Sequence, residues 1–322
     1  MSELLVKDFI GKRGKSGDIG IEIEVEAHDE LPDIKTKEWT SKKEGSLRVG
    51  GKEYVSNGPL VISSTPRHLK FLSDSLSKCK IIHDSPRASV HMHLNVMYKT
   101  PVQYWTQVCA YWLTENLLMD FCGEYRKGNS FCLRLLDAEG VLRYAHNDLK
   151  QSLPFASLHN DAIRYCGQNL KATYKFGSIE YRGMEFTIDP NKLYTWANQL
   201  YLLGLNTKDF ANPARFMDEY FLNDGSKEFL SKIFDKDFVS TITKSDNWKD
   251  RLEINEGVIC ELAYVHDWDR WERNITQAYK DVGGVKRKDA YVDPFGRPGN
   301  VAQPNIQFVG FDNNLLFMGD DD

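Results

Sequence analysis

The sequence contains no C-x-x-C pair, although six cysteines are present. Without a paired or regular spacing, these cysteines match neither a zinc motif nor a disulfide framework, and we expect free thiols of a reducing compartment. Long hydrophobic runs are missing too, since no stretch reaches the roughly 18 apolar residues that a membrane helix needs. The N-terminus, MSELLVKDFIGKRGKSG, has only short apolar runs, so no signal peptide is expected. These absences predict a cytoplasmic protein that does not enter the membrane.

An excess of charge of one sign is also absent. The 322 residues carry 41 Lys and Arg against 46 Asp and Glu, a net charge of -5. Because a dedicated nucleic-acid binder normally shows a basic excess, nucleic acid is not the expected partner. Hydrophobic residues make up 41% and charged residues 27%, which is typical of a globular protein with a large core.

Four segments are expected to form strands. Residues 18–27 and 88–98 alternate apolar and polar side chains, and strand character returns at 173–182 and 185–188. Because the side chains of a strand alternate between its faces, each of these segments presents one polar and one apolar side. The polar sides carry most of the residues that can do chemistry.

Two threonines that precede prolines predict the starts of helices. Thr65 and Thr100 can each serve as the N-cap, with the following proline as the first helical residue. The second helix is expected to extend to about Phe121. Short strands and loops are expected over 123–165.

The pattern becomes mostly helical from Pro190 onward. The segment from Val282 is rich in Gly, Pro and Asn and ends in G-D-D-D, so an extended acidic tail is expected. We therefore predict a catalytic core of residues 1–204 and a mostly helical extension of residues 205–322 that packs on the core.

One familiar motif is incomplete. Residues 11–16, G-K-R-G-K-S, contain the G-K-S of a phosphate-binding P-loop. The full motif needs a glycine five positions before Gly14, where this chain has Phe9. The segment also precedes a strand instead of following one and opening a helix. A basic surface loop is the better interpretation.

Three glutamates share one face of the first predicted strand. In G-I-E-I-E-V-E, Glu22, Glu24 and Glu26 alternate with apolar residues. A row of like charges repels itself unless water, a cation or basic side chains face it. Taken alone, the row is explained by a solvated outer face of the strand. Whether it instead faces a cation or basic side chains depends on the residues of the other strands.

A second polar row occurs in A-S-V-H-M-H-L-N-V, where His91, His93 and Asn95 share a face. A single histidine in a strand is usually structural. Two histidines followed by an asparagine instead place three groups that can bind metal or phosphate in one row.

Two further segments with acidic residues complete the set. Glu180 and Arg182 share a strand face in I-E-Y-R, where the guanidinium suits a phosphate or a carboxylate and a cross-strand salt bridge is the alternative. Glu44 and Glu53 lie on either side of a glycine-rich turn. Carboxylates in this number, without thiolates, predict a Mg²⁺ or Mn²⁺ site. With an arginine beside it, such a site is typical of phosphoryl transfer on a Mg-nucleotide.

In this order, the motifs resemble the carboxylate–amine ligases of the glutamine synthetase and glutamate–cysteine ligase superfamily. The amidoligase family of phage and bacterial genomes is the most similar, and the resemblance covers residues 18 to about 200. The acid before Gly45 is Glu where the family commonly has Asp. The matching residues are Gly20, Glu22, Glu24, Trp39, Glu44, Gly45, Ser46, Leu47, Glu53, Val55, Ser56, Pro59, Leu60, His91, His93, Asn95, Arg164, Tyr165, Asn169, Leu170, Glu180 and Arg182.

This resemblance implies an α+β fold with a curved, mostly antiparallel glutamine synthetase-like sheet backed by helices. The concave face of the sheet would bind Mg·ATP. It also implies that a carboxylate attacks the γ-phosphate of ATP and that an amine then displaces phosphate from the acyl phosphate to form an amide. The cofactors implied are ATP and Mg²⁺ or Mn²⁺, and the partners are an acid substrate and an amine substrate.

The resemblance also assigns roles to individual residues. Arg182 would stabilise the transferring phosphoryl group or hold the substrate carboxylate, and it is grouped with Glu180 and Glu53 as catalytic. Arg126 and Arg134 are further candidates for phosphate contacts, whereas Glu26 lies outside the family pattern. The expected metal ligands are Glu22, Glu24, Glu53, His91 and Glu180, and the expected nucleotide contacts are His93, Asn95, Arg164 and Arg182.

Two alternatives stay open at this point. The same acidic sheet could serve a kinase or another metal-dependent phosphotransferase or hydrolase. The chain could also be an ATP- or metal-binding structural or interaction protein that retains the fold. The sequence assigns neither the acid nor the amine, and it leaves a homo-oligomer open.

Overall fold

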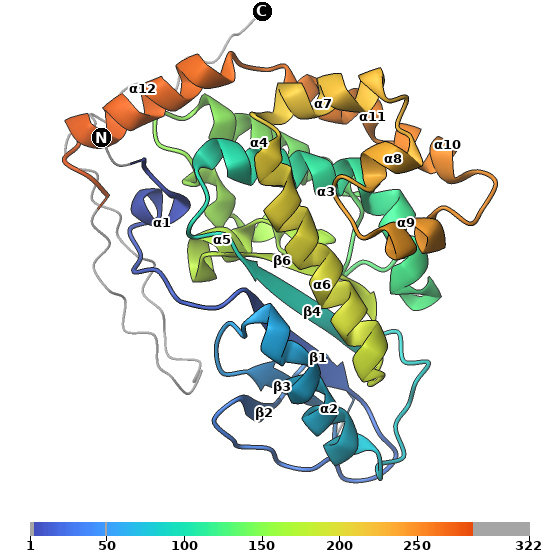
Figure 1. Ribbon diagram of the computed structural model, residues 1–322. Helices are drawn as coiled ribbons and strands as arrows, with labels where there is room; N and C mark the ends of the chain where they lie inside the picture. The colour runs from blue at the N-terminus through green and yellow to red at the C-terminus, as the bar shows by residue number, and fades with distance from the viewer. Residues whose placement is uncertain (1–2, 49, 286–322) are drawn as a thin grey trace, which may run out of the picture.

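A single open sheet of six antiparallel strands is the centre of the fold (Figure 1). The structure, a computed structural model, describes residues 3–48 and 50–285. The strand order is β2-β3-β1-β4-β6-β5, and every neighbouring pair is antiparallel. The strands are β1 (Ile19–Val25), β2 (Trp39–Lys43), β3 (Lys52–Ser56), β4 (Ser89–Asn95), β5 (Gln168–Asn169) and β6 (Ser178–Glu185). The predicted α+β class is confirmed at this level.

Helices cover one face of this sheet (Figure 1). Helix α6 packs on β4, α3 packs on β6, and α2 packs on α6. The apolar side chains of β1, including Ile21 and Ile23, are buried toward these helices. The helices are α1 (Val6–Phe9), α2 (Thr65–Leu76), α3 (Pro101–Cys122), α4 (Glu139–Lys150), α5 (Lys171–Phe176), α6 (Pro190–Asn206), α7 (Pro213–Leu222), α8 (Lys227–Leu230), α9 (Lys236–Ile242), α10 (Trp248–Glu253), α11 (Glu256–Ala263) and α12 (Trp268–Asp281).

Helix α3 is the central element of the core, and its predicted start is confirmed. The Thr100 hydroxyl accepts a hydrogen bond from the Gln103 amide (3.1 Å), while the Gln103 side chain accepts one from the Thr100 amide (3.1 Å). This reciprocal capping box, with proline as the first helical residue, satisfies two otherwise orphaned amides. The helix is buried along nearly its whole length. It ends at Cys122, one residue beyond the predicted end.

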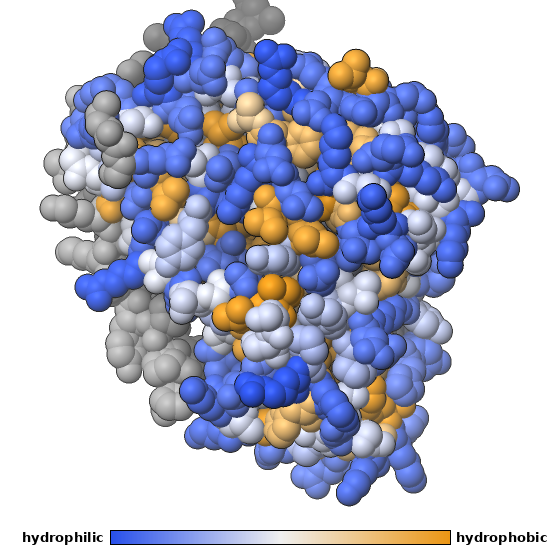
Figure 2. Space-filling model, viewed as in Figure 1, coloured by the Kyte–Doolittle hydropathy of each residue, from blue (hydrophilic) through white to orange (hydrophobic). Residues whose placement is uncertain are grey.

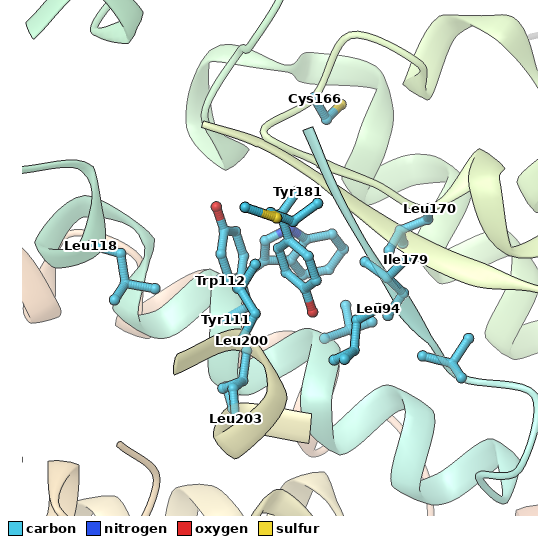
Figure 3. Packing of buried hydrophobic residues seen from close by; sticks show 14 of the residues in the cluster. Leu94, Tyr111, Trp112, Leu118, Cys166, Leu170, Ile179, Tyr181, Leu200 and Leu203 are labelled. Carbon is cyan, nitrogen blue, oxygen red and sulfur yellow. The ribbon is translucent and has the colours of Figure 1, made fainter. Parts of the chain in front are cut away.

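Aromatic side chains join the sheet to α3 (Figure 3). The rings of Tyr111 on α3 and Tyr181 on β6 lie 4.7 Å apart. The Tyr181 hydroxyl accepts a hydrogen bond of 2.7 Å from the Gln107 amide, so the polar end of this buried ring is satisfied. Leu94 of β4 and Leu200 of α6 extend the same apolar layer. The tyrosine in I-E-Y-R thus anchors β6 from behind, while its polar neighbours face the other way.

Several local predictions are wrong. Helix α2 begins at Thr65 itself, whose hydroxyl donates to the Val61 carbonyl (3.2 Å) instead of capping the helix. The segment 123–165 contains helix α4, because its buried residues recur at helical spacing. The strand expected over 173–182 is helix α5 up to Phe176 and β6 from Ser178.

Gly177 explains that change of conformation. With φ of +78°, it closes α5 in the left-handed conformation that only glycine adopts readily, so the chain switches from helix to strand at one residue. The strand expected over 185–188 is also wrong, since β6 already ends at Glu185.

The described residues beyond 204 are mostly helical. Helices α7, α9, α10, α11 and α12 pack on α3. The Asn255 side-chain amide donates to the Trp112 carbonyl at 2.6 Å, which ties the loop between α10 and α11 to the core. The acidic tail predicted from Val282 falls largely on residues 286–322, outside the described residues.

The surface in the same view is mostly hydrophilic, with hydrophobic side chains in several small groups (Figure 2). Among the described helices, none combines the length and the apolar character that crossing a membrane requires. The glutamates and the histidine predicted as metal ligands lie on the sheet face opposite to α2, α3 and α6.

Candidate functional site

Polar side chains from all six strands gather on the sheet face that the core helices leave free. The antiparallel register brings them together, because residues paired between neighbouring strands point to the same side. Lys42 pairs with Glu53 and Glu53 with Glu24; Glu22 pairs with His91; and His93 pairs with Glu180 and Glu180 with Asn169. Motifs that are far apart in the sequence thus form adjoining rows.

These rows form the floor of a cavity of about 370 Å³. The lining of the whole cavity includes two histidines, seven Lys or Arg side chains and five carboxylates. The five carboxylates are those of Glu22, Glu24, Glu44, Glu53 and Glu180. The structure therefore brings together the acidic residues singled out in the sequence, with the exception of Glu26.

Two histidines link the carboxylates at the centre of the floor. His93 Nε2 lies 3.4 Å from Glu22 Oε1. His91 Nδ1 lies 3.4 Å from Glu180 Oε1 and 3.6 Å from Glu22 Oε2. The Ser89 hydroxyl fixes the other side of His91, at 2.9 Å from Nε2, and also donates to Glu24. Few side chains of this group are free to reorient.

Glu22, His93 and Glu180 lie close enough together that they could hold a metal ion. Each offers one ligand atom, and these atoms lie within 4.8 Å of one another. Carboxylate oxygens suit Mg²⁺ and Mn²⁺, and an imidazole nitrogen is a better ligand for Mn²⁺ than for Mg²⁺. The donor set therefore fits a divalent cation. The sequence assignment named His91 as the histidine ligand; His91 lies beside this triad, against Ser89.

Electrostatics keep two of these carboxylates ionised despite burial. Burial opposes the charge on Glu22, but the charge of His93 and the bonds from both histidines outweigh it and hold the pKa of Glu22 well below its ordinary value. The same balance, with His93 and Arg182 as the main favourable charges, lowers the pKa of Glu180. Burial would lower the pKa of His93, but the charge of Glu22 outweighs it and raises that pKa.

Glu53 behaves in the opposite way. Burial, together with the charge of Glu22, raises the pKa of Glu53 to about 8, although Lys42 lies 2.6 Å away. Burial lowers the pKa of Lys42, but attraction to Glu53 outweighs it and raises that pKa. Burial first, and the charge of Glu22 second, therefore favour the protonated form of Glu53 near neutral pH.

Arg182 is paired with Glu180 within strand β6, whereas the alternative considered from the sequence was a cross-strand salt bridge. Its Nη1 donates to Glu180, and its Nε donates to the Phe131 carbonyl (3.1 Å). Asn169 donates to the second oxygen of Glu180 at 2.6 Å. Because both Arg182 and Glu180 also line the cavity, this pair orients a floor carboxylate.

A cationic wall rises beside the acidic floor. Arg164 is exposed, with its guanidinium 5.6 Å from the ring of Tyr165, and Lys175 lies 4.7 Å from the ring of Phe176. Burial, followed by repulsion from Arg164 and Lys171, lowers the pKa of Lys175. This wall adjoins the floor within one cavity, so the site offers negative and positive surfaces to the same ligand.

Not every predicted contact faces the main cavity. Asn95 lines a smaller cavity of about 200 Å³, which shares Glu22 and His93 with the larger one. Its side-chain amide donates to the carbonyls of Lys15 (2.9 Å) and Gly17 (2.8 Å), so it anchors the basic loop before β1. Of the weaker arginine candidates, Arg126 lines the main cavity.

Arg134 lies outside the lining of that cavity. It bonds to Asp137 at 3.1 Å and to Asn116 at 3.3 Å. Glu26 is likewise outside the site, and it is 1% exposed instead of solvated. It accepts hydrogen bonds from the Ser85 hydroxyl (2.6 Å) and the Arg48 amide (2.5 Å). Glu26 therefore holds two loops beside the site.

Sequence reasoning missed several contributors to the cavity, among them Ser89, Lys42 and Lys175. Ser89 shares the face of His91 and His93, and the same alternation could have identified it. Lys42 stands at the end of β2, opposite Glu53, which only the strand register reveals. Lys175 was missed because its segment was interpreted as a strand.

Comparisons of the chain with protein-family models, with curated proteins and with solved structures find no match.

Proposed function

We propose that the protein is an ATP-dependent carboxylate–amine ligase that forms an amide bond through an acyl phosphate. One observation supports this proposal above all, the joining of an acidic floor and a cationic wall in a single cavity. Phosphoryl transfer needs both surfaces, because cations must screen the triphosphate while basic side chains hold anionic substrate groups. The ordered sequence motifs, which supply the floor, point to the same chemistry.

In this proposal, Glu22, His93 and Glu180 would hold a divalent cation, and Glu24 and Glu53 stand next to them for a second one. A bound cation would screen the phosphate charges and align the attacking and leaving oxygens. Hydrogen bonds within the chain already orient these metal-binding side chains before a cation or a substrate binds. Arg182 and Asn169 fix both oxygens of Glu180, and Ser89 fixes His91 and Glu24.

The cationic wall would bind the substrate anions. Arg164 and Lys175 face the cavity without an ion-pair partner among the described residues, so they can neutralise phosphate or carboxylate groups. Arg182, with its charge balanced by Glu180, acts mainly by orienting that carboxylate. This division refines the assignment of Arg182 that the family resemblance implied.

A metal-dependent phosphotransferase is the second candidate, because the same triad and cationic wall would serve it. Product analysis separates the two. A ligase product contains both the acid and the amine, whereas a kinase product carries a phosphate and a hydrolase gives two fragments without consuming ATP.

The proposal is tested by measuring release of ADP and phosphate with Mg²⁺, ATP and a panel of acids and amines, with product masses determined in parallel. Glu22→Gln and Glu180→Gln should abolish turnover, since each removes one carboxylate of the triad. Glu44→Gln is the matched control, because Glu44 lines the cavity outside the triad. Failure of the unaltered protein to bind Mg·ATP would contradict the proposal.

A further inference from the structure

Arg126 is a buried cation in the wall of the main cavity. It ends the short turn Glu124–Arg126, only 2% of its surface is exposed, and it lines the cavity beside Arg182. Taking a charge out of water is costly unless a partner of opposite charge compensates it. A buried arginine therefore normally has a carboxylate beside it.

Arg126 has no such partner among the residues that the structure describes. Its Nη2 donates to the backbone carbonyl of Arg182 at 2.9 Å, and its side chain also contacts the Cys132 thiol; neither partner is a carboxylate. Its Nε is buried and makes no hydrogen bond within the described chain. The other buried guanidinium of the site, that of Arg182, is paired with Glu180. Of these two buried guanidiniums, that of Arg126 is the one whose charge no carboxylate of the described residues balances.

Other cations around the cavity increase this local excess. Arg87 contacts the Ser46 carbonyl at 3.4 Å, and Arg164 and Lys175 face aromatic rings. Within the described chain none of the three has an ion-pair partner, and all line the same cavity as Arg126. Residues that destabilise the empty protein but face a cavity are typical of a binding site, where the ligand supplies the missing charge.

We infer that Arg126 is the principal anion-binding residue of the cavity and that its guanidinium binds an oxyanion of the substrate. The shared chemistry is that of a carboxylate or a phosphate, held by charge-assisted hydrogen bonds from a planar fork of donors. The site rests on the burial and the missing partner of Arg126. Only the source of the anion, acid substrate or nucleotide, rests on the proposed function.

The test compares the unaltered full-length protein with Arg126→Met, Arg126→Lys and the control Arg134→Met. Arg134 is suitable because it lies near Arg126 in the chain, is paired with Asp137 and lies outside the cavity lining. Calorimetric titrations use Mg-tripolyphosphate as the phosphate probe and glutarate as the carboxylate probe. Thermal unfolding of each protein without ligand is measured in parallel.

The inference predicts that Arg126→Met weakens binding of at least one probe tenfold or more. Arg126→Lys should retain part of that affinity, and Arg134→Met should leave both probe affinities unchanged. It also predicts that Arg126→Met melts at or above the temperature of the unaltered protein, because an unpaired buried charge has been removed. A loss confined to tripolyphosphate identifies the nucleotide as the source of the anion, and a loss confined to glutarate identifies the acid substrate.

Two outcomes would overturn the inference. In the first, Arg126→Met lowers the melting temperature and leaves both affinities unchanged, which is the result for a purely structural arginine. In the second, the unaltered protein binds neither probe. The proposed function fails separately, if Mg·ATP does not bind while an anion still binds in an Arg126-dependent way.

Discussion

His93 Nε2 and Glu22 Oε1 lie 3.4 Å apart and join β4 to β1 across the floor of the cavity. The two residues are diagonal neighbours, because the register pairs Glu22 with His91 and His93 with Gly20. This contact supplies the charge that keeps Glu22 ionised although burial opposes it. It also gathers ligand atoms from three strands, since Glu180 of β6 completes the group.

The first prediction concerns metal affinity. Glu22→Gln should lower the affinity for Mn²⁺ by about 100-fold, because it removes an anionic ligand from the triad. Titration calorimetry with Mn²⁺ measures the change, and Glu44→Gln should bind as the unaltered protein does. Equal Mn²⁺ affinity in Glu22→Gln would show that the triad holds no cation.

The second prediction separates Glu26 from the other two glutamates of its row. Glu26→Gln should destabilise the protein by about 1–3 kcal/mol, because a buried carboxylate that accepts bonds from Ser85 and Arg48 loses one acceptor. Urea unfolding measures the free energy, and Mn²⁺ affinity should stay unchanged. A fall in Mn²⁺ affinity without a loss of stability would place Glu26 in the metal site instead.

The third prediction concerns pH and a carboxyl group behind the sheet. Burial raises the pKa of Glu115 on α3 to about 7, although the Leu135 amide donates to it at 2.8 Å. Between about pH 4.5 and 7 the folded state keeps this proton while the unfolded state loses it. The stability that Glu115 contributes is therefore complete below that window and falls as pH rises through it, by about 3 kcal/mol.

Glu115→Gln should remove its share of this slope. Burial also raises the pKa of Asp148 to about 7, and that of Glu53 is raised to about 8, so most of the combined fall should persist in the variant. Urea unfolding at pH 5 and pH 8 checks the difference: relative to the unaltered protein, the variant should gain stability at the higher pH. Parallel stability curves for the two proteins would contradict the account.

The fourth prediction concerns the glycine that ends α5. Gly177→Ala should cost at least about 2 kcal/mol, because a Cβ there would lie 2.1 Å from Met97 Cε and φ is +78°. Gly128→Ala is the matched control, since its φ is +70° with open space around it, and should cost about 1 kcal/mol. Equal unfolding free energies for the two variants would show that Met97 does not restrict the chain here.

The acidic floor was predictable because strand alternation is a local property. G-I-E-I-E, H-M-H-L-N and I-E-Y-R each show which residues share a face, and burial of Ile21 and Ile23 confirms that choice for β1. Helix α3 was predictable because its N-cap is also a local signal: a Thr-Pro pair, with a glutamine three residues after the threonine.

The cationic wall was predictable only in part: Arg164 was named through the family resemblance, whereas Lys175 lies in a segment with a weak local pattern. Lys175 follows an alternation that suits a strand, and only the left-handed Gly177 after it allows a short helix. The pairing of Arg182 with Glu180, and the missing partner of Arg126, likewise depend on which strands and turns become neighbours. A sequence pattern shows which residues share a face of a strand. Which charged side chains become partners can be seen only in the folded chain.

The central claim is that the acidic floor and the cationic wall bind Mg·ATP together. Calorimetric titration of the full chain with ATP, with Mg²⁺ present and then removed by a chelator, tests it most directly. The account predicts saturable binding that requires the metal and that weakens at least tenfold in Glu22→Gln. Absence of binding, or equal binding with and without Mg²⁺ in both proteins, would contradict it.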